Sequence, residues 1–166
     1  MAQLGPAETF DLINFGGTGD LAMRKLLPAL YHRDLDGQLT PDSRIVAASR
    51  GEMSREDYVR LVEEALRRNL AEGEFDESFW LTFANRIHYA QADAFAHDEW
   101  SSLVRLLDSV GDRVRVAYLA TAPSLFGPIA QGLRHNGLVT ETSRIVLEKP
   151  LGRDLDSARE INNAIA

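Results

Sequence analysis

The residues with the clearest chemical meaning lie in the segment GGTGDLA, which begins at Gly16 directly after the apolar run 10–15. Glycine lets the backbone turn tightly and lets a ligand approach closely, because it carries no side chain. The spacing of Gly17, Gly19 and Ala22 matches the pattern G-x-G-x-x-G/A, in which the N–H groups that open a helix bind a diphosphate. The segment therefore predicts a dinucleotide-binding turn. A glycine-rich turn without a ligand is the alternative.

Asp20 lies inside this segment, and its carboxylate would repel a diphosphate if it pointed toward one. We expect Asp20 to cap the N-terminus of the following helix instead. Pro28 interrupts the apolar pattern of that helix and should kink it.

The second apolar run ends in Ser49 and Arg50. Proteins that select NAD usually place an acid here to bind the ribose hydroxyls, whereas arginine forms paired hydrogen bonds to the 2′-phosphate of NADP. Arg50 therefore favours NADP as the cofactor. A solvated surface arginine is the alternative.

Two later strand ends could also face the cofactor. The segment EKPLG places Glu148 and Lys149 where nicotinamide and substrate should meet, although a surface lysine at a strand exit would look the same. In ATAPSLF we expect a turn over 121–123, with Ser124 capping the next helix. Phe126 could cover a nicotinamide or adenine edge, but an aromatic residue one turn into a helix is more typical of a core.

These residues need strands and helices to position them. Apolar runs predict strands at 10–15, 44–48, 86–90, 114–120 and 144–148. Helical spacing predicts helices near 54–69, 76–84, 98–110, 124–136 and 154–165. Because each strand precedes a helix, we expect an α/β, doubly wound (Rossmann-type), mostly parallel sheet with helices on both faces. The segment 51–85 is long enough to carry two helices. Ser54 with Asp57 resembles a capping box.

Composition narrows the possible classes of protein. The 166 residues suit one domain, and the formal charge of −7 argues against a nucleic-acid or membrane-surface binder. The chain has no cysteine, which excludes disulfides and thiolate metal sites. There is no apolar leader or long apolar run, so we expect a cytoplasmic protein. The helical pattern still runs at residue 166, which suggests a fragment.

The sequence resembles the glucose-6-phosphate dehydrogenase family. GGTGDLAMRKLLPALY is similar to that family's G-x-x-G-D-L-A…K…P-x-L signature, and VLEKPLGRDLDSA to its E-K-P-x-G-x-D-L-x-S segment. YLATAPSLF lies between them, so the resemblance spans essentially the whole chain.

The resemblance implies a role for each candidate residue. The NADP diphosphate would be wrapped by Gly16, Gly17, Thr18, Gly19, Asp20, Leu21 and Ala22. Arg50 would bind the 2′-phosphate, and Asp93 with Ala94 would lie beside the adenosine. Lys149 would contact both cofactor and sugar phosphate, and the peptide between Lys149 and Pro150 would be cis.

The resemblance also implies the reaction, in which glucose 6-phosphate is oxidised at C1 to 6-phosphogluconolactone while NADP accepts the hydride, the entry to the pentose phosphate pathway. The family's base is a histidine paired with an aspartate in an Arg-Ile-Asp-His-Tyr segment, and none of the four histidines here has that context. We therefore expect no catalytic residue in this chain. Residues 1–166 would be the NADP-binding domain, without the family's α+β substrate domain. The full-length parent would be an enzyme that forms a homo-oligomer, and this part alone would be inactive.

Two other classes remain open. A sugar oxidoreductase of the glucose–fructose oxidoreductase type shares the E-K-P strand end, but the GDLA…K…P stretch and the long segment 51–85 count against it. A non-catalytic NADP-sensing domain would share every cofactor feature. No metal site is expected.

Overall fold

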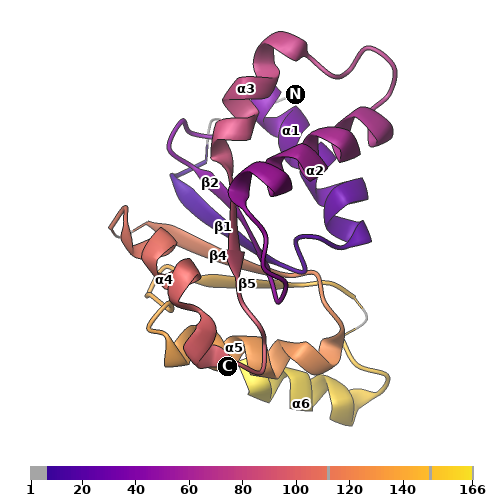
Figure 1. The fold of residues 1–166 in the computed structure, drawn as a ribbon. Helices are drawn as coiled ribbons and strands as arrows, with labels where there is room; N and C mark the ends of the chain where they lie inside the picture. The colour runs from indigo at the N-terminus through magenta and orange to yellow at the C-terminus, as the bar shows by residue number, and fades with distance from the viewer. Residues whose placement is uncertain (1–6, 112, 150, 166) are drawn as a thin grey trace.

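The computed structural model describes residues 7–111, 113–149 and 151–165, which form a five-stranded sheet of order β3-β2-β1-β4-β5 (Figure 1). All four strand pairings are parallel. The strands are β1 (Phe10–Phe15), β2 (Arg44–Ser49), β3 (Ile87–Gln91), β4 (Val114–Leu119) and β5 (Arg144–Leu147). The order reverses between β1 and β4, which is where sheets of this kind bind ligands, at the carboxyl ends of the strands.

The helices cover both faces of this sheet. They are η1 (Ala22–Leu26), α1 (Leu27–Leu35), α2 (Arg55–Asn69), α3 (Glu77–Arg86), η2 (His97–Glu99), α4 (Ser101–Asp108), η3 (Pro123–Leu125), α5 (Phe126–His135) and α6 (Leu155–Ile165). Figure 1 shows α1, α2 and α3 on one side of the sheet and α4, α5 and α6 on the other. The doubly wound α/β fold is confirmed, and the segment 51–85 does carry two helices. Among the described residues, no helix is long and apolar enough to cross a lipid bilayer.

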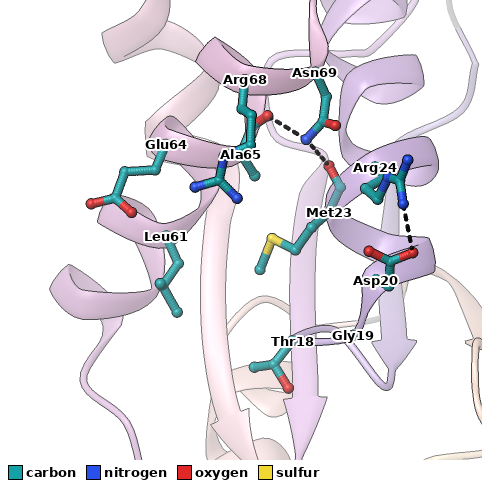
Figure 2. A pocket seen from close by; sticks show the side chains of 10 residues that line it. All are labelled: Thr18, Gly19, Asp20, Met23, Arg24, Leu61, Glu64, Ala65, Arg68 and Asn69. Carbon is teal, nitrogen blue, oxygen red and sulfur yellow. Dashed lines mark hydrogen bonds and ion pairs between the residues drawn. The ribbon is translucent and has the colours of Figure 1, made fainter.

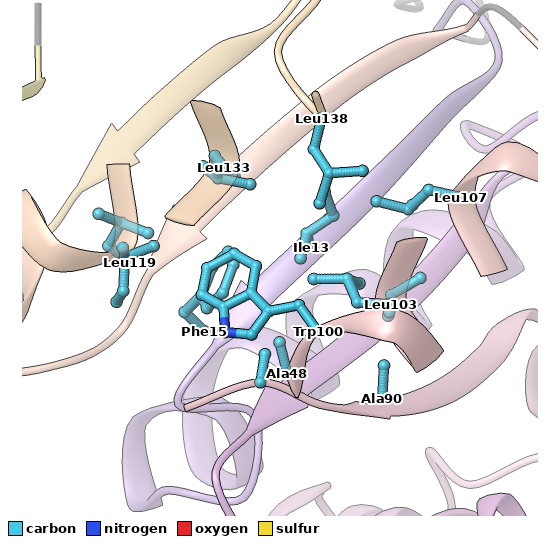
Figure 3. Close-up of a cluster of buried hydrophobic side chains, with 14 of the residues drawn as sticks. Ile13, Phe15, Ala48, Ala90, Trp100, Leu103, Leu107, Leu119, Leu133 and Leu138 are labelled. Carbon is cyan, nitrogen blue, oxygen red and sulfur yellow. The ribbon is translucent and has the colours of Figure 1, made fainter. Parts of the chain in front are cut away.

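Each face of the sheet has its own apolar core. Neighbouring residues of β2 point to opposite faces, so that Val46 packs with the α4 and α5 side and Ile45 with the α1 and α2 side. On the first side, Trp100 is fully buried, and its ring lies 5.4 Å from that of Phe15 (Figure 3). Because both faces are covered, the strands read as almost continuous apolar runs in the sequence.

Most element boundaries agree with the sequence-based expectations, and the exceptions have local causes. Arg86 was expected in the third strand but ends α3, because its buried guanidinium binds Asp34 at 2.7 Å and carbonyl groups of the 40–43 loop. Ser124 was expected to cap a helix, but it lies inside η3 and α5 begins without a side-chain cap. The Ser54 cap is confirmed, since its hydroxyl accepts the Asp57 N–H.

Pro28 is accommodated by a widened turn. Residues Ala22–Leu26 are π-helical, and the Leu27 N–H donates to the carbonyl of Ala22, five residues earlier. Proline has no N–H and its ring crowds the preceding turn, so a wider turn before it relieves the conflict. The irregularity predicted at Pro28 therefore lies just before it, in the helix that follows the glycine segment.

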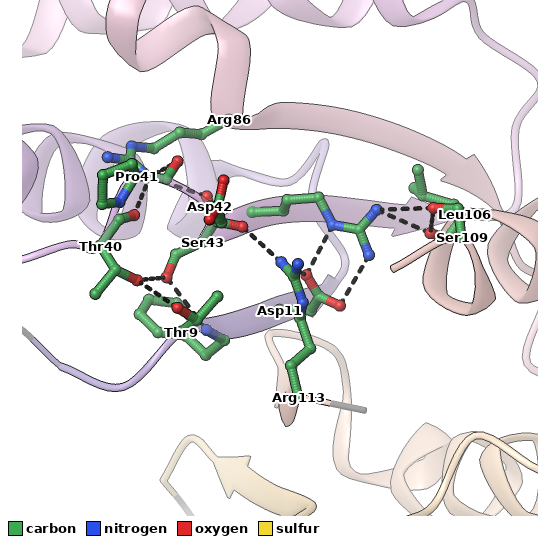
Figure 4. A network of polar contacts seen from close by, with 12 residues as sticks. Thr9, Asp11, Thr40, Pro41, Asp42, Ser43, Arg86, Leu106, Ser109 and Arg113 are labelled. Atoms are coloured by element: carbon green, nitrogen blue, oxygen red, sulfur yellow. Dashed lines mark hydrogen bonds and ion pairs between the residues drawn. The ribbon is translucent and has the colours of Figure 1, made fainter. Parts of the chain in front are cut away.

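A buried polar network holds the amino ends of the central strands together (Figure 4). Asp11 on β1 is fully buried, and its two carboxylate oxygens each accept a hydrogen bond of 2.8 Å from Arg44 on β2. Arg44 also donates to the carbonyl of Leu106 in α4, and Arg113 lies 3.5 Å from Asp11. This network joins β1 and β2 to α4, at the ends of the strands opposite the glycine segment.

His88 on β3 should make stability depend on pH. Burial, followed by the nearby charges of Arg55 and Arg44, lowers the pKa of His88 to about 4 from its usual 6.5, with Asp11 acting in the opposite direction. The unfolded chain therefore binds more protons between these values, and stability should fall as the pH falls from about 6.5 to about 4. Thermal unfolding of wild type and His88→Gln across this range measures the effect. The stability of His88→Gln should depend less steeply on pH than that of the wild type. An equal pH dependence in the two proteins would contradict the assignment.

Candidate functional site

The glycine segment forms a tight turn at the carboxyl end of β1. Gly16 has φ of +85°, a conformation that favours glycine, and its N–H donates to the Ala48 carbonyl at 3.0 Å. A Cβ atom on Gly16 would run into the carbonyl oxygen of Ala120 after β4. The turn therefore crosses the point where the strand order reverses, with no space for a side chain.

Gly17 lies against the next strand. A Cβ atom here would lie 2.5 Å from the Cβ of Ala47 on β2, which is far inside van der Waals contact. The buried hydroxyl of Tyr58, from α2, donates to the Gly17 carbonyl at 2.7 Å, and burial raises the pKa of Tyr58 so that this donor stays protonated. The described residues offer no acceptor to the N–H groups of Gly17 and Thr18. Both amides are therefore unpaired within the described residues; Thr18 is exposed and lines the cleft beside the turn, whereas Gly17 is buried.

The helix after the turn begins one residue earlier than expected. Asp20 and Leu21 already have helical backbone and lead into η1, and the Gly19 carbonyl accepts the Met23 N–H at 3.1 Å. The prediction that Asp20 caps the helix is therefore wrong: its carboxylate is exposed and pairs with Arg24, one turn on, at 3.4 Å. Leu21 is 36% exposed, whereas Ala22 is fully buried and allows the close helix–strand packing that its position predicted.

An open cleft of about 400 Å³ lies beside this turn, at the carboxyl ends of four strands. Its size is within the range of small-molecule sites. It brings together Gly16, Thr18, Arg50, Asp93 and Ala94 from the sequence-based candidates. The rest of the lining is Phe15, Ala48, Ser49, Ala92, Phe95, Thr121, Leu125 and Ile129.

Arg50 is the basic residue of this cleft. It is exposed, and within the described part of the chain no ion pair or side-chain hydrogen bond involves its guanidinium. Its carbonyl accepts a hydrogen bond of 3.0 Å from Gln91, which ties the end of β2 to that of β3. The hydroxyls of Thr18 and Ser49 lie 3.3 Å apart in the same lining. One guanidinium and two hydroxyls can together bind a phosphate. Sequence reasoning did not assign Ser49 to the site.

Asp93 and Ala94 lie in the loop after β3. The Asp93 carboxylate accepts the Phe95 N–H at 2.9 Å, so this acid shapes its own loop. The exposed aromatic residue of the cleft lining is Phe95, which the sequence reasoning missed. Phe126, which it considered as an aromatic cover, is 1% exposed and belongs to the core. The signal available in the sequence was an aromatic residue two positions after an acid, just beyond the end of a strand.

Lys149 lies at the same edge of the sheet, two residues after β5, but does not line the 400 Å³ cleft. It is exposed. The neighbouring Glu148 accepts a hydrogen bond from Tyr118 on β4, and burial, together with this contact, raises the pKa of Tyr118 to about 12. The expected cis peptide involves Pro150, which lies outside the described residues.

A second cleft, of about 660 Å³, lies between the helix after the glycine turn and α2 (Figure 2). Gly19 and Asp20 line it, together with Arg24, Glu64 and Arg68. Figure 2 shows Asp20 paired with Arg24, and Asn69 bridging to the Met23 carbonyl. Two acids accompany the two arginines of this cleft, and Arg24 is already paired with Asp20.

The four histidines lie elsewhere. None of His32, His88, His97 and His135 lines the cleft beside Arg50. His135 lies 2.8 Å from Asp98 in an exposed pair, and His97 contacts the Ala94 carbonyl. Across the described ranges, no group of three or more His, Asp or Glu residues could hold a metal ion.

A parallel doubly wound sheet, with a side-chain-poor turn and free amides at its switch point, defines the class of dinucleotide-binding domains. Residues 13–166 match the family model described as the glucose-6-phosphate dehydrogenase NAD binding domain. The chain belongs to the glucose-6-phosphate dehydrogenase family.

Relatives and solved structures agree with this membership. Glucose-6-phosphate 1-dehydrogenase of Rhizobium meliloti is 47% identical over 99% of this chain, and that of Mycolicibacterium smegmatis 43% over 96%. The crystal structure of the Mycobacterium avium enzyme aligns with a TM-score of 0.81 and 29% identity over 96% of the chain. A glucose-6-phosphate dehydrogenase in complex with glucose-6-phosphate aligns equally well over 100%. The chain spans 33% of the length of those two curated relatives.

Proposed function

We propose that this chain is the coenzyme-binding part of an NADP-dependent glucose-6-phosphate 1-dehydrogenase. The observation that carries the proposal is the placement of Arg50 in the same cleft as the glycine turn, with no carboxylate at the end of β2. A diphosphate at the free amides of Gly17 and Thr18 would leave the adenosine ribose between that turn and Arg50. Its 2′-phosphate would then meet a guanidinium.

Residues 1–166 would form one domain for NADP. Gly16 to Ala22 would surround the diphosphate, with Asp93 and Ala94 beside the adenosine. Because Asp93 already accepts the Phe95 N–H, its contribution would be the shape of the loop more than a direct contact. The cofactor, when bound, accepts a hydride at its nicotinamide ring.

The nicotinamide half would extend from the switch point toward β5, where Lys149 stands. A lysine ammonium there would bind both the cofactor and the phosphate of glucose 6-phosphate. Oxidation at C1 also removes a hydroxyl proton, and a positioned base contributes about 10²- to 10⁴-fold to such a step. We propose that this base comes from outside residues 1–166, since none of the four histidines lines the cleft. These residues alone would therefore bind NADP without turnover.

The wider setting follows from the same proposal. An NADP-dependent oxidation of glucose 6-phosphate would supply the pentose phosphate pathway in the cytoplasm, and the full-length protein would assemble as a homo-oligomer. The substrate-binding α+β domain would lie outside this chain.

Arg50→Ala should weaken NADP binding by about 10- to 100-fold and leave NAD binding nearly unchanged. The reason is that the variant removes charge-assisted hydrogen bonds to a phosphate that NAD lacks, and these contribute about 1.5–3 kcal/mol. Calorimetric titration with both coenzymes measures the difference.

Arg105→Ala is the matched control, because Arg105 is an exposed arginine on α4, away from the cleft. It should bind NADP like the wild type. If Arg50→Ala also binds NADP as tightly as the wild type, the assignment of the 2′-phosphate site is wrong.

A further inference from the structure

Among the described residues, Phe95 is the most exposed large apolar side chain, at 76%. It lines the cleft that contains Gly16 and Arg50, whereas the other aromatic residue of that lining, Phe15, is buried in the core. Scattered exposed apolar side chains are ordinary, but an aromatic ring in the lining of a cleft is a common way to bind a flat heterocycle.

The exposure of Phe95 does not come from a loose loop. Its N–H donates to the Asp93 carboxylate at 2.9 Å, and the Asp93 carbonyl accepts a 2.7 Å hydrogen bond from the indole of Trp100. Trp100 is fully buried in the core. The Ala96 N–H also donates to the Asp93 carbonyl. The backbone on both sides of Phe95 is therefore anchored, and the ring is held in solvent by a fixed loop.

The loop of Phe95 is also fixed relative to Arg50. The Ala92 N–H donates to the Ser49 carbonyl at 2.8 Å, and the Gln91 amide donates to the Arg50 carbonyl at 3.0 Å. These two bonds join the ends of β2 and β3. Arg50 and Phe95 thus present a guanidinium and an aromatic ring from adjacent strand ends into one cleft.

We propose that Phe95 stacks on the adenine ring of the coenzyme, opposite Arg50. This inference rests on the proposed function and deepens it. With the diphosphate at the glycine turn and the 2′-phosphate at Arg50, the adenine ring would extend from the ribose over the ends of β2 and β3. The loop 92–95 lies at this place. Every purine offers a flat π face, so stacking adds affinity there without needing a hydrogen-bonding partner.

The test uses adenosine 2′,5′-bisphosphate, which carries the adenine and the 2′-phosphate but no nicotinamide. Phe95→Ala should weaken its binding by about 5- to 100-fold, in line with the loss of one stacked base. Phe95→Tyr and Phe95→Trp keep a flat ring and should bind within a few-fold of the wild type. Leu81→Ala is the matched control, because Leu81 is 71% exposed on α3 and lines none of the clefts beside the glycine turn.

A second measurement does not depend on the stability of the alanine variant. In Phe95→Trp the new indole should lose fluorescence when the bisphosphate binds, whereas wild type, whose Trp80 and Trp100 are buried, should change little. Stacking is overturned if Phe95→Ala binds the probe as tightly as the wild type, or if the new tryptophan is not quenched while the probe binds. Wild type that binds neither the probe nor NADP would instead overturn the proposed function, and this inference with it.

Discussion

Gly17→Ala is expected to lower the free energy of unfolding by about 1–3 kcal/mol and to weaken NADP binding at least about tenfold. The added methyl group would lie 2.5 Å from the Cβ of Ala47 and 2.9 Å from its Cα, so the turn or β2 has to move. The same movement displaces the amides of Gly17 and Thr18, which we assign to the diphosphate. Chemical denaturation and calorimetric titration measure the two effects.

Two further variants show whether the collision with Ala47 is the cause. Gly51→Ala is the control, because a Cβ atom at Gly51 meets nothing within 4 Å and its backbone does not have a positive φ. Combining Gly17→Ala with Ala47→Gly removes the nearest colliding atom, so the double variant should recover part of the lost binding, as a positive coupling energy. If Gly17→Ala alone binds NADP like the wild type, the turn does not hold the diphosphate.

Asp11→Ala is expected to cost about 3–5 kcal/mol of the free energy of unfolding, the largest effect among these variants. Asp11 is fully buried, and its removal would leave Arg44, which is 9% exposed, without its carboxylate partner. A charge buried without a partner is costly because it has lost its water and gained nothing in exchange. Because the network lies at the amino ends of the strands, away from the cleft at their carboxyl ends, the coenzyme affinity of the folded fraction should stay unchanged.

Two comparisons separate the burial of the pair from its charge. Glu63→Gln removes the negative charge from the solvent-accessible pair with Arg67 and should cost less than about 1 kcal/mol. The double variant Asp11→Leu with Arg44→Met removes both charges, so it should be more stable than Asp11→Leu alone. A loss for Asp11→Ala as small as that for Glu63→Gln would show that the buried pair does not hold β1 to β2.

Local signals predicted much of the fold because they act within a few residues. The strand 10–15 coincides with β1, and the Ser54 cap begins α2 as expected, since a cap depends on groups only three residues apart. Arg86 is the contrasting case. Its place at the end of α3 depends on Asp34 and on carbonyls of the 40–43 loop, which lie more than forty residues away in sequence.

Some features of the candidate site can likewise be predicted from short-range sequence, and others depend on tertiary contacts. The glycine spacing and the arginine after the second strand are properties of the sequence itself, and they predicted a dinucleotide turn and the residue beside it. The sequence did not determine which aromatic side chain lines the cleft. Phe126 and Phe95 both follow a strand end, but Phe126 turns into the core at the start of α5, while Asp93 and Trp100 hold Phe95 in the cleft.

By itself, the sequence determined the class of sheet, the turn that can approach a phosphate, and the basic residue next to it, because residue type and short-range spacing decide backbone conformation and charge. The tertiary structure alone decided that Ala47 leaves no space at Gly17, that Tyr58 holds that turn from α2, and that Phe95 is exposed beside Arg50. Those facts depend on contacts between segments distant in sequence, whose distances exist only once the two layers of helices have packed onto the sheet.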